Sequence, residues 1–407
     1  MRTKTLRNVS KDDTSINAQL LTRAGYIRRL SSGVYTLLPL GLRVLNKIEA
    51  IIREEIEGIG SSEILMPALQ PKSIWQTSGR DTMDVLFETA SGNSVLAPTH
   101  EEVASMIAAN YIESYDDLPL SFFQIQTKFR NEPRAKSGLL RGREFRMMDM
   151  YSFHTEPEEL GAYYIHVRRA FQRIFTRLGI EPILTYASGG SFSDYSQEFQ
   201  LEALSGEDTI FVGDNVAINK EIVDTTLAHD LTQGQQLREC KAIEIANIFK
   251  LGTRFCDAFR CGYTNEDGFK SPVYMGCYGI GTTRLMGAIV EHYHDDNGII
   301  WPDSVAPYKL HVVSLVKTQE NMQKLEHIID LLKRNGIDFY YDDTPESAGV
   351  KLKDADLFGI PYRMVISDRT LTYNEVELKN RKTGDTKRIN SDTLCKDETL
   401  VKIACKN

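Results

Sequence analysis

The sequence predicts an α+β fold in two units, and three observations carry this prediction. Residues 40–58 and 157–178 place apolar side chains at the spacing of amphipathic helices. Residues 129–154 are typical of two strands joined by a basic, glycine-containing loop. From Ala306 onward an apolar strand, a helix and a second strand follow with a short crossover, which indicates a separate, smaller α/β domain.

The composition agrees with a soluble protein of two or three domains. A chain of 407 residues can bury a large core, and its 42% hydrophobic and 26% charged residues are ordinary values. No apolar run approaches the roughly 18 residues of a membrane span, so no membrane partner is expected. We expect one unit over residues 1–303 and a second over residues 304–407.

Charge and cysteine content restrict the partners and the compartment. Because the net charge is −8, a nucleic-acid partner must bind local basic patches and not the overall field. The six cysteines form neither a C-x-x-C pair nor a zinc-ligand spacing, so reduced thiols are expected. The N-terminus is basic but lacks the apolar core of a signal peptide. We expect a cytoplasmic protein, or one of the mitochondrial matrix if the source is eukaryotic.

The N-terminal part predicts two helices and two strands. Residues 14–32 favour a helix, and residues 33–38 favour a short strand. The helix over 40–58 ends in a glycine-rich segment, which is a stop signal. A strand over 63–66 follows and ends at a proline.

The segment from Ser94 to Glu102 predicts a strand that runs into the start of a helix. Thr99 and Glu102 have the spacing of a capping box, in which both side chains satisfy backbone N–H groups at a helix N-terminus. This structural interpretation is compatible with a further role of the segment in binding.

A nucleotide pocket is the functional interpretation of residues 129–154. Alternation along the first strand puts Arg130 and Glu132 on one face. A guanidinium can hold a phosphate bidentately, a carboxylate can accept from an exocyclic amine, and Phe145 on the returning strand can stack on a base. The alternative is a solvated basic hairpin, because runs of charge usually are exposed. The basic side chains of the loop are Arg134, Lys136, Arg141 and Arg143.

The remainder of the first unit predicts further strands and a helix. Residues 181–204 contain a strand, a glycine- and serine-rich segment and a second strand-like run. Residues 242–252 alternate as a strand, in which Glu244 needs a partner if it is buried. Residues 275–284 contain G-x-G-x-x-R before a helix over 285–294. This is not a dinucleotide fingerprint, because arginine replaces the third glycine and no βαβ unit precedes it.

The second unit begins with residues 308–316, a nearly continuous apolar strand of the kind found in sheets that are covered on both faces. An amphipathic helix over 319–334 follows, and strands are expected over 336–341 and 359–366. A segment rich in glycine, lysine and aspartate separates these two strands.

Together these motifs resemble those of class II aminoacyl-tRNA synthetases, and of prolyl-tRNA synthetases in particular. Residues 128–154 (KFRNE to GREFRMMDMYSFH) are similar to motif 2, and residues 275–294, which begin MGCYGIGTTR, to motif 3. The helix and strand over about 40–67 resemble motif 1, PTHEE at 98–102 resembles the Thr-x-Glu loop, and 349–361 resembles class IIa anticodon-binding domains. The resemblance implies a catalytic domain with an antiparallel sheet flanked by helices, followed by a small α/β anticodon-binding domain.

The resemblance also implies substrates and site residues. Arg130 and Arg284 would be catalytic: Arg130 at the α-phosphate and the substrate carboxylate, Arg284 at the terminal phosphate. Thr99 and Glu101 would bind the secondary ammonium of proline, whose two N–H donors match a hydroxyl and a carboxylate. ATP would contact Arg130, Glu132, Arg141, Phe145, Glu244, Asn247 and Arg284, with Glu244 also a Mg2+ contact. L-Proline would contact Thr99, Glu101, Arg130, Met147, Asp149, Tyr151, His154, Phe199, Phe249, Cys277 and Gly279.

Partners follow from the resemblance as well. Motif 1 implies a homodimer, with a helix packed inside its own domain as the alternative. The second unit implies tRNA(Pro), although residues 342–348 lack two arginines of the usual D-R-x-E-R-P pattern. Residues 206–241 leave no room for the inserted editing domain of many bacterial relatives, and whether a separate protein clears alanyl-tRNA stays open at this point. Gln197 stands where histidine is typical.

The implied reaction has two steps. The proline carboxylate attacks the α-phosphate of ATP in line and gives prolyl-adenylate and pyrophosphate; the terminal adenosine of the tRNA then attacks the mixed anhydride. No general base is needed for the first step, so catalysis is positioning and electrostatic stabilisation, with Mg2+ neutralising phosphate oxygens.

Two other functions stay open. A non-catalytic relative that only binds nucleic acid would be expected to lose Arg130, Phe145 or Arg284, and all three are present. A ligase that adenylates an amino acid for another acceptor is allowed by the altered loop at 342–348.

Overall fold

The computed structural model describes residues 3–9, 14–133, 135–190, 192–193 and 195–404. Arg134 of the predicted basic loop, Ser191 of the glycine- and serine-rich segment and Cys405 lie outside the described residues. None of the helices in the described ranges has the length and apolar character needed to cross a membrane.

Nine strands form the main sheet of the first unit, in the order β10-β9-β12-β11-β13-β16-β8-β7-β3. The pairs β3–β7 and β12–β9 are parallel, and the neighbours along the centre of the sheet, from β13 to β7, are antiparallel. This arrangement confirms the predicted α+β class. The strands are β3 (Ser62–Glu63), β7 (Leu120–Phe129), β8 (Glu144–His154), β9 (Ile183–Ser188), β10 (Tyr195–Glu202), β11 (Asp208–Val212), β12 (Ala217–Asn219), β13 (Arg238–Gly252) and β16 (Tyr274–Ile280).

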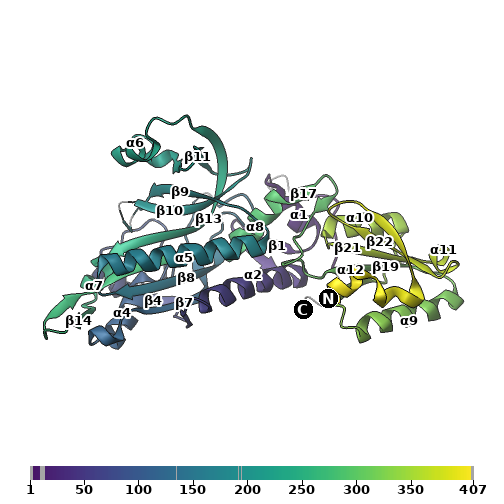
Figure 1. Cartoon of the computed structure of the whole chain (residues 1–407), viewed down its shortest axis with the longest axis horizontal. Coiled ribbons are helices and arrows are strands. Elements are labelled where there is room, and N and C mark those ends of the chain that lie inside the picture. Colours follow the sequence, from purple (N-terminus) through teal and green to yellow (C-terminus); the bar gives the residue numbers. More distant parts are fainter. Residues whose placement is uncertain (1–2, 10–13, 134, 191, 194, 405–407) are drawn as a thin grey trace.

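One face of this sheet is covered by α5 (Pro157–Leu178), which runs along it in Figure 1 beside α2 (Pro39–Glu57). Helix α5 is bounded by Pro157 at its start and by Gly179 in the left-handed conformation at its end, as expected for these residues. Its apolar stripe, Val167, Phe171 and Ile174, is buried in the largest hydrophobic core. The predicted helices over 40–58 and 157–178 are confirmed.

Short helices and strands cover the other face of the main sheet. A three-stranded sheet of β4 (Leu69–Pro71), β5 (Phe87–Glu88) and β6 (Ser94–Leu96) carries α3 (Lys72–Thr77) and leads into α4 (Glu101–Tyr111). The strand and helix start predicted for 94–102 are therefore present. Helix α7 (Arg254–Ala258) and the hairpin β14 (Gly262–Thr264) with β15 (Lys270–Pro272) lie beyond α4, and β16 leads into α8 (Thr282–His292).

Two N-terminal predictions need correction. The helix expected over 14–32 is only α1 (Ile16–Arg23), because Gly25 adopts a left-handed backbone (φ 68°) that ends it. The chain then forms the hairpin β1 (Ile27–Ser31) and β2 (Val34–Leu37), which turns at Gly33, also at positive φ (74°). The strand predicted at 63–66 is shorter than expected, since only the two residues of β3 pair with β7.

The segment between β10 and β13 is small. It contains β11, β12, one 3-10 turn (Lys220–Ile222) and α6 (Thr226–Thr232), which Figure 1 shows above the end of the main sheet. Every residue from 203 to 237 is described and takes part in this compact extension. The chain therefore carries no inserted editing domain at this position, as the sequence predicts.

The second unit lies at one end of the long axis in Figure 1. Its five-stranded sheet has the order β20-β19-β21-β22-β23, with α9 (Gln319–Arg334) and α10 (Ala348–Phe358) packed against it. The strands are β19 (Leu310–Leu315), β20 (Phe339–Asp342), β21 (Tyr362–Ser367), β22 (Glu375–Asn380) and β23 (Thr386–Asn390). Helix α10 was not predicted, since its glycine, lysine and aspartate content hides the short helix that Ser347 caps.

The two units share a buried contact. Trp301 Nε1 donates to the Tyr26 hydroxyl (2.9 Å), which donates to the carbonyl of Phe358 in α10 (2.7 Å). Arg381 donates two hydrogen bonds to Asp295 (2.7 and 2.6 Å) across the same boundary. The boundary proposed at residues 303 and 304 lies in the connection that follows β18 (Gly298–Ile299) and precedes β19.

Candidate functional site

The candidate site lies on the face of the main sheet that α5 does not cover. Strand register places its residues in two rows across β13, β16 and β8, because directly opposed residues in an antiparallel sheet point to the same side. One row is Asn247, Gly279 and Asp149, and the next is Phe249, Cys277 and Tyr151. The structure therefore brings together residues that the sequence separates by more than one hundred positions.

Glu101 is the centre of the first half of the site. It begins α4 and is only 1% exposed. The Thr99 hydroxyl lies 2.8 Å from both oxygens of its carboxylate, and Arg80 Nη1 donates to Oε2 at 3.0 Å. Cys277 donates its S–H to Oε1 at 3.3 Å, and burial raises the pKa of this thiol well above its usual value, which keeps it a donor.

The capping-box interpretation of Thr99 and Glu102 is wrong. The helix is preceded by His100, which makes no side-chain capping bond, and the Thr99 hydroxyl is directed to Glu101 instead. Thr99 and Glu101 thus form one hydroxyl–carboxylate pair, which is the arrangement that the resemblance implied for an ammonium site.

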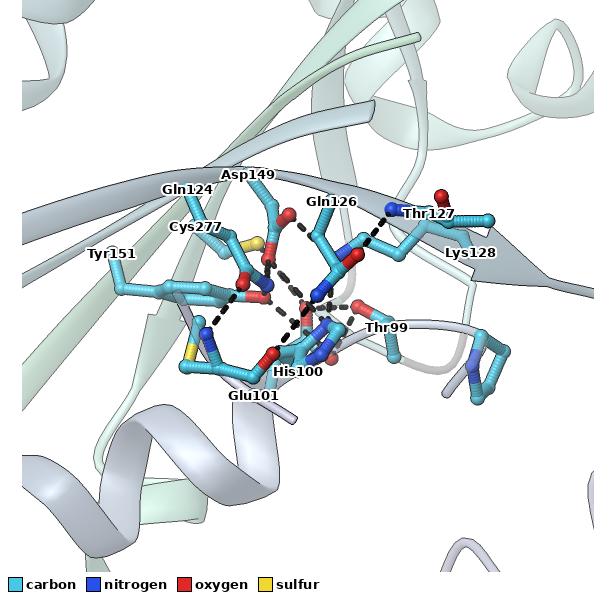
Figure 2. Close-up of polar contacts among 12 residues, drawn as sticks. Thr99, His100, Glu101, Gln124, Gln126, Thr127, Lys128, Asp149, Tyr151 and Cys277 are labelled. Atoms are coloured by element: carbon cyan, nitrogen blue, oxygen red, sulfur yellow. Dashed lines mark hydrogen bonds and ion pairs between the residues drawn. The ribbon is translucent and has the colours of Figure 1, made fainter. Parts of the chain in front are cut away.

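A buried polar network lies beside this pair (Figure 2). Lys128 is fully buried, and its Nζ lies 2.5 Å from Asp149 Oδ1 and 2.6 Å from His100 Nδ1. His100 Nε2 lies 3.1 Å from the carbonyl of Pro67, so the consistent assignment is a neutral ring that accepts at Nδ1 and donates at Nε2. Burial, and then the charge of Lys128, lower the pKa of His100 to about 4, which agrees with that assignment.

Asp149 and Tyr151 belong to this network. Asp149 Oδ2 accepts from Gln124 Nε2 (3.0 Å) and from the Tyr151 hydroxyl (2.9 Å), and the backbone N–H of His100 donates to the same hydroxyl at 3.2 Å. The Asp149 side chain is nearly inaccessible to solvent. Both residues were predicted to contact proline; the structure directs their polar groups to the loop that holds Thr99 and Glu101.

The second half of the site is a cavity of about 270 Å³ beside this pair. Its lining includes every residue that the sequence predicts to contact ATP, and also Met147 and Gly279, which were predicted to contact proline. The lining residues include Arg130, Glu132, Arg141, Phe145, Met147, Glu244, Asn247, Gly279 and Arg284.

Arg130 lies where the two halves meet. Its guanidinium carbon lies 5.1 Å from the centroid of the Phe145 ring, and its Nε donates to the carbonyl of Pro98, next to Thr99, at 3.4 Å. Burial and the nearby Arg284 charge lower its pKa. Strand β7 ends at Phe129, so the prediction that strand alternation sets the direction of Arg130 is wrong: the residue lies in the loop after the strand.

Two of the three arginines that line the cavity, Arg284 and Arg141, are paired with carboxylates. Arg284 Nη1 lies 3.1 Å from Glu244 Oε2, and Asn247 Nδ2 donates to Glu244 Oε1 at 2.8 Å. Arg141 contacts Glu132 (2.9 Å) and also Glu207 (3.1 Å). Glu244 thus has the partner that a partly buried carboxylate on a strand requires. An anionic ligand in the cavity would compete with these carboxylates for the guanidinium groups.

Two predicted site residues lie on the opposite face of the sheet. His154 Nε2 lies 2.9 Å from Ser152 Oγ, and its ring contacts Tyr163 of α5 at 5.0 Å. Phe199 packs against Phe171 and Phe175 of α5, with ring centroids 5.8 and 5.1 Å apart. Both predictions as proline contacts are wrong. For His154 the reason is strand alternation: it is an odd number of positions from Asp149 and Tyr151.

Several residues around the site were not predicted. Arg80 contacts Glu101, and Lys128 contacts Asp149. Phe192 packs on Phe249 with ring centroids 5.0 Å apart. Lys128 gave one signal in the sequence, a lone charge in the otherwise uncharged strand QIQTKF. Arg80 gave none, because a single arginine after a turn is usually exposed.

Comparisons with known proteins agree with this fold. The family model of the tRNA synthetase class II core domain (G, H, P, S and T) matches residues 87–293, and that of the anticodon binding domain matches residues 309–396. A Giardia lamblia prolyl-tRNA synthetase in complex with prolyl-adenylate has a similar fold, with a TM-score of 0.78 and 21% identity over 95% of this chain and 77% of that chain.

Curated relatives are similar over nearly the whole chain. The proline–tRNA ligase of Anaplasma phagocytophilum is 38% identical, over 95% of this chain and 96% of the relative. That of Anaplasma marginale is 39% identical over 96% of each chain. That of Shouchella clausii is 32% identical over an alignment of 540 residues, which covers 94% of this chain and 95% of the relative. The chain therefore belongs to the class II aminoacyl-tRNA synthetases, in the family of the proline–tRNA ligases.

Proposed function

We propose that this chain activates L-proline with ATP and transfers the prolyl group to the 3′ end of tRNA(Pro), with release of pyrophosphate and AMP. The observation that carries this proposal is the place of Arg130. It lines the cavity with Phe145 and Arg284, and it is hydrogen-bonded to the loop that carries Thr99 and Glu101. A side chain that contacts both the amino acid and ATP, next to the bond that forms between them, is expected at this position.

The amino-acid half of the site suits a secondary ammonium. The Glu101 carboxylate already accepts from Thr99, Arg80 and Cys277, and its negative charge attracts a cation at this buried position. In our proposal the two N–H groups of proline bind Thr99 and Glu101. Phe249 and Cys277 lie in the same row of the sheet and form the wall beside the pyrrolidine ring.

The nucleotide half of the site suits a triphosphate. We assign the adenine to Phe145 and Glu132, and the distal phosphates to Arg141 and Arg284. When these arginines bind phosphate, they give up the carboxylate contacts described above.

The chemistry follows from positioning and charge. The proline carboxylate is ionised at neutral pH, so it attacks the α-phosphate without a general base. Arg130 holds this carboxylate and the α-phosphate together and stabilises the charge that develops on the phosphate oxygens. Loss of one such contact typically costs about 2.7–4 kcal/mol of transition-state stabilisation.

Mg2+ would be held through Glu244. Burial and the Glu244 carboxylate raise the pKa of Glu198 to about 8, and burial also raises the pKa of Asp208, so ionisation of these two carboxyl groups beside Glu244 is unfavourable and a nearby cation would favour it. The described residues contain no group of three His, Cys, Asp or Glu side chains placed to hold a metal ion. Mg2+ usually binds through one or two carboxylates plus substrate phosphates, and Glu244 fits that role. When bound, the ion neutralises phosphate oxygens.

We also propose the partners that the family implies. The second unit is assigned to tRNA(Pro), and a separate protein is assigned to the clearance of alanyl-tRNA. The homodimer is proposed from the likeness to motif 1; in or next to this motif three leucines are exposed, namely Leu30 (79%), Leu65 (74%) and Leu69 (57%). The alternative noted above also has support, because α2 packs on α5 and α8 of its own chain. The cytoplasmic location stays a prediction from the sequence.

The test of this proposal is ATP–pyrophosphate exchange by an Arg130→Ala variant. We expect a loss of about 100- to 1,000-fold in proline-dependent exchange, since a transition-state contact is removed. Arg173→Ala is the matched control: Arg173 lies on the outer side of α5, is half exposed and pairs only with Glu55 among the described residues. Exchange at the wild-type rate by Arg130→Ala would remove Arg130 from the mechanism.

A further inference from the structure

Arg80 is an almost fully buried arginine outside the three motifs. It follows the short helix α3, in a turn that no part of the mechanism above uses. Its side chain is 2% exposed, and its guanidinium lies near the rings of Trp75, Phe192 and Phe255, at 5.3, 4.7 and 5.2 Å from their centroids. A buried guanidinium among aromatic rings is costly unless carboxylates compensate its charge.

The compensation comes from two adjacent glutamates of α4. Arg80 Nη1 donates to Glu101 Oε2 at 3.0 Å and to Glu102 Oε1 at 3.1 Å, and both carboxylates are buried. The Ser78 hydroxyl donates to the same oxygen of Glu102 at 2.8 Å. Within the described part of the chain, Arg80 Nε, Arg80 Nη2 and Glu102 Oε2 have no hydrogen-bond partner. The single nitrogen Nη1 therefore joins the two carboxylates.

The charges of this buried region leave room for a zwitterionic substrate. Glu101, Glu102 and Asp149 supply three carboxylates, Arg80 and Lys128 pair with them, and His100 is neutral. The third cation near Glu101 is Arg130, which is assigned above to the substrate carboxylate, so a protonated substrate nitrogen takes its place as the partner of Glu101. Arg80 determines how much of the Glu101 charge is left for that nitrogen, because it divides its own charge between Glu101 and Glu102.

We propose that Arg80 is a positioning residue for the ammonium group of the amino-acid substrate, acting by holding the Glu101 carboxylate in place while it divides its own charge between Glu101 and Glu102. This inference rests on the proposed function. It predicts that Arg80 governs binding of the amino acid and has little effect on binding of ATP, since its only carboxylate partners in the described residues lie in the amino-acid half of the site.

The same contact sets the direction of a pH effect. Burial raises the pKa of Glu102, and Arg80 opposes this increase. Removal of Arg80 takes away the charge that opposes this increase, so the pKa of Glu102 rises further and its ionised form is lost at a higher pH. The charged and titratable groups that face Glu101 are Arg80, Glu102, Tyr151, Asp149, Cys277, Lys128, His100 and Arg130. Of these, Arg80 alone donates to both carboxylates of α4 in the described residues.

The experiment compares Arg80→Met and Arg80→Lys in ATP–pyrophosphate exchange, with KM measured separately for proline and for ATP. For Arg80→Met we expect the KM for proline to rise about 100-fold, the size of effect seen when a buried charged contact is lost. The KM for ATP should change by less than about threefold. Arg80→Lys keeps the positive charge, so its KM for proline should be about tenfold lower than that of Arg80→Met. The acidic limb of the pH profile of kcat/KM for proline should move to higher pH in Arg80→Met and back in Arg80→Lys.

The matched control is Arg381→Met. Arg381 is also buried and also pairs with a carboxylate, Asp295, but it lies at the boundary between the two units. This variant should lower the thermal midpoint and leave both KM values unchanged. Arg80 would be merely structural if Arg80→Met raised both KM values equally, or if Arg381→Met raised the KM for proline as much at the same loss of stability. If Arg80→Met does not fold, the KM values and pH profile of Arg80→Lys decide in the same way.

Failure of this inference is distinguishable from failure of the proposed function. If the wild-type chain shows no proline-dependent exchange, the proposed function fails and the inference fails with it. If the wild-type chain exchanges with proline but the Arg80 variants show no separation between the two KM values, the proposed function stands and the role of Arg80 is refuted.

Discussion

Lys128→Met tests the buried network most severely. The Lys128 ammonium and the Asp149 carboxylate lie 2.5 Å apart, with side chains 0% and 4% exposed, so solvent screens neither charge. The variant keeps the length of the side chain but leaves Asp149 as an uncompensated buried anion, and His100 loses the donor to its Nδ1. Breaking a buried pair in this way typically costs about 3–5 kcal/mol.

The assay is equilibrium unfolding in urea, followed by fluorescence. Trp75 reports on the first unit directly, because it is buried and its Nε1 donates to Gln70, whose Nε2 in turn donates to the carbonyl of Thr99. We expect the free energy of unfolding of this unit to fall by about 3–5 kcal/mol. A change below about 1 kcal/mol would refute the claim that the two charges depend on each other.

A second variant separates the lost pair from lost packing. In Lys128→Met/Asp149→Asn the buried anion is gone, while the asparagine oxygen can still accept from Tyr151 or Gln124. We expect this double variant to be more stable than Lys128→Met alone, by about 2 kcal/mol, because an unpaired charge costs more than a neutral amide. If the double variant were less stable than the single one, the cost would come from packing and not from charge.

Two further predictions concern pH and assembly. Burial lowers the pKa of His100 and His154 to about 4 and that of His311 to about 3, below the value of 6.5 in an unfolded chain. The unfolded state then binds more protons than the folded state below pH 6.5, so the thermal midpoint should fall as the pH decreases from 6.5 toward 4. The variant His311→Phe should make that decrease shallower. A thermal midpoint that is constant over this range would contradict buried neutral imidazoles. Sedimentation at working concentration should give twice the chain mass of 46.1 kDa, and a Leu65→Asp variant should sediment as a monomer; a wild-type monomer would exclude the homodimer.

Much of the site could be predicted from the sequence because its residues lie in short, ordered motifs. The seven residues assigned to ATP come from two contiguous stretches and one strand, and the structure places all of them around one cavity. Their grouping follows from strand order, which the motifs of a known family imply.

The polar network of Lys128, His100 and Asp149 beside Glu101 could not be predicted, because its contacts depend on long-range pairing. Lys128 contacts His100 and Asp149, which are 28 and 21 positions away, and the burial of a lysine is contrary to the average behaviour of that residue. Local pattern alone indicates a basic strand end near a phosphate site. Only the tertiary structure shows that this charge belongs to the amino-acid half of the site.

Other errors came from local signals that compete with each other. The helical pattern over 14–32 continues past Gly25, yet the left-handed backbone of that glycine and the turn at Gly33 favour a hairpin. Conversely, α10 has a glycine as its second residue and carries several charges, so its sequence does not show the usual amphipathic stripe. The error at His154 was avoidable, since strand alternation already separates it from Tyr151.

The most direct test of the central claim is ATP–pyrophosphate exchange by the wild-type chain across a panel of amino acids. The hydroxyl–carboxylate pair of Thr99 and Glu101 beside the Arg130 cavity, in a chain of the proline–tRNA ligase family, predicts exchange that depends on proline. Exchange that depends on a different amino acid, or no exchange with proline, would contradict the account.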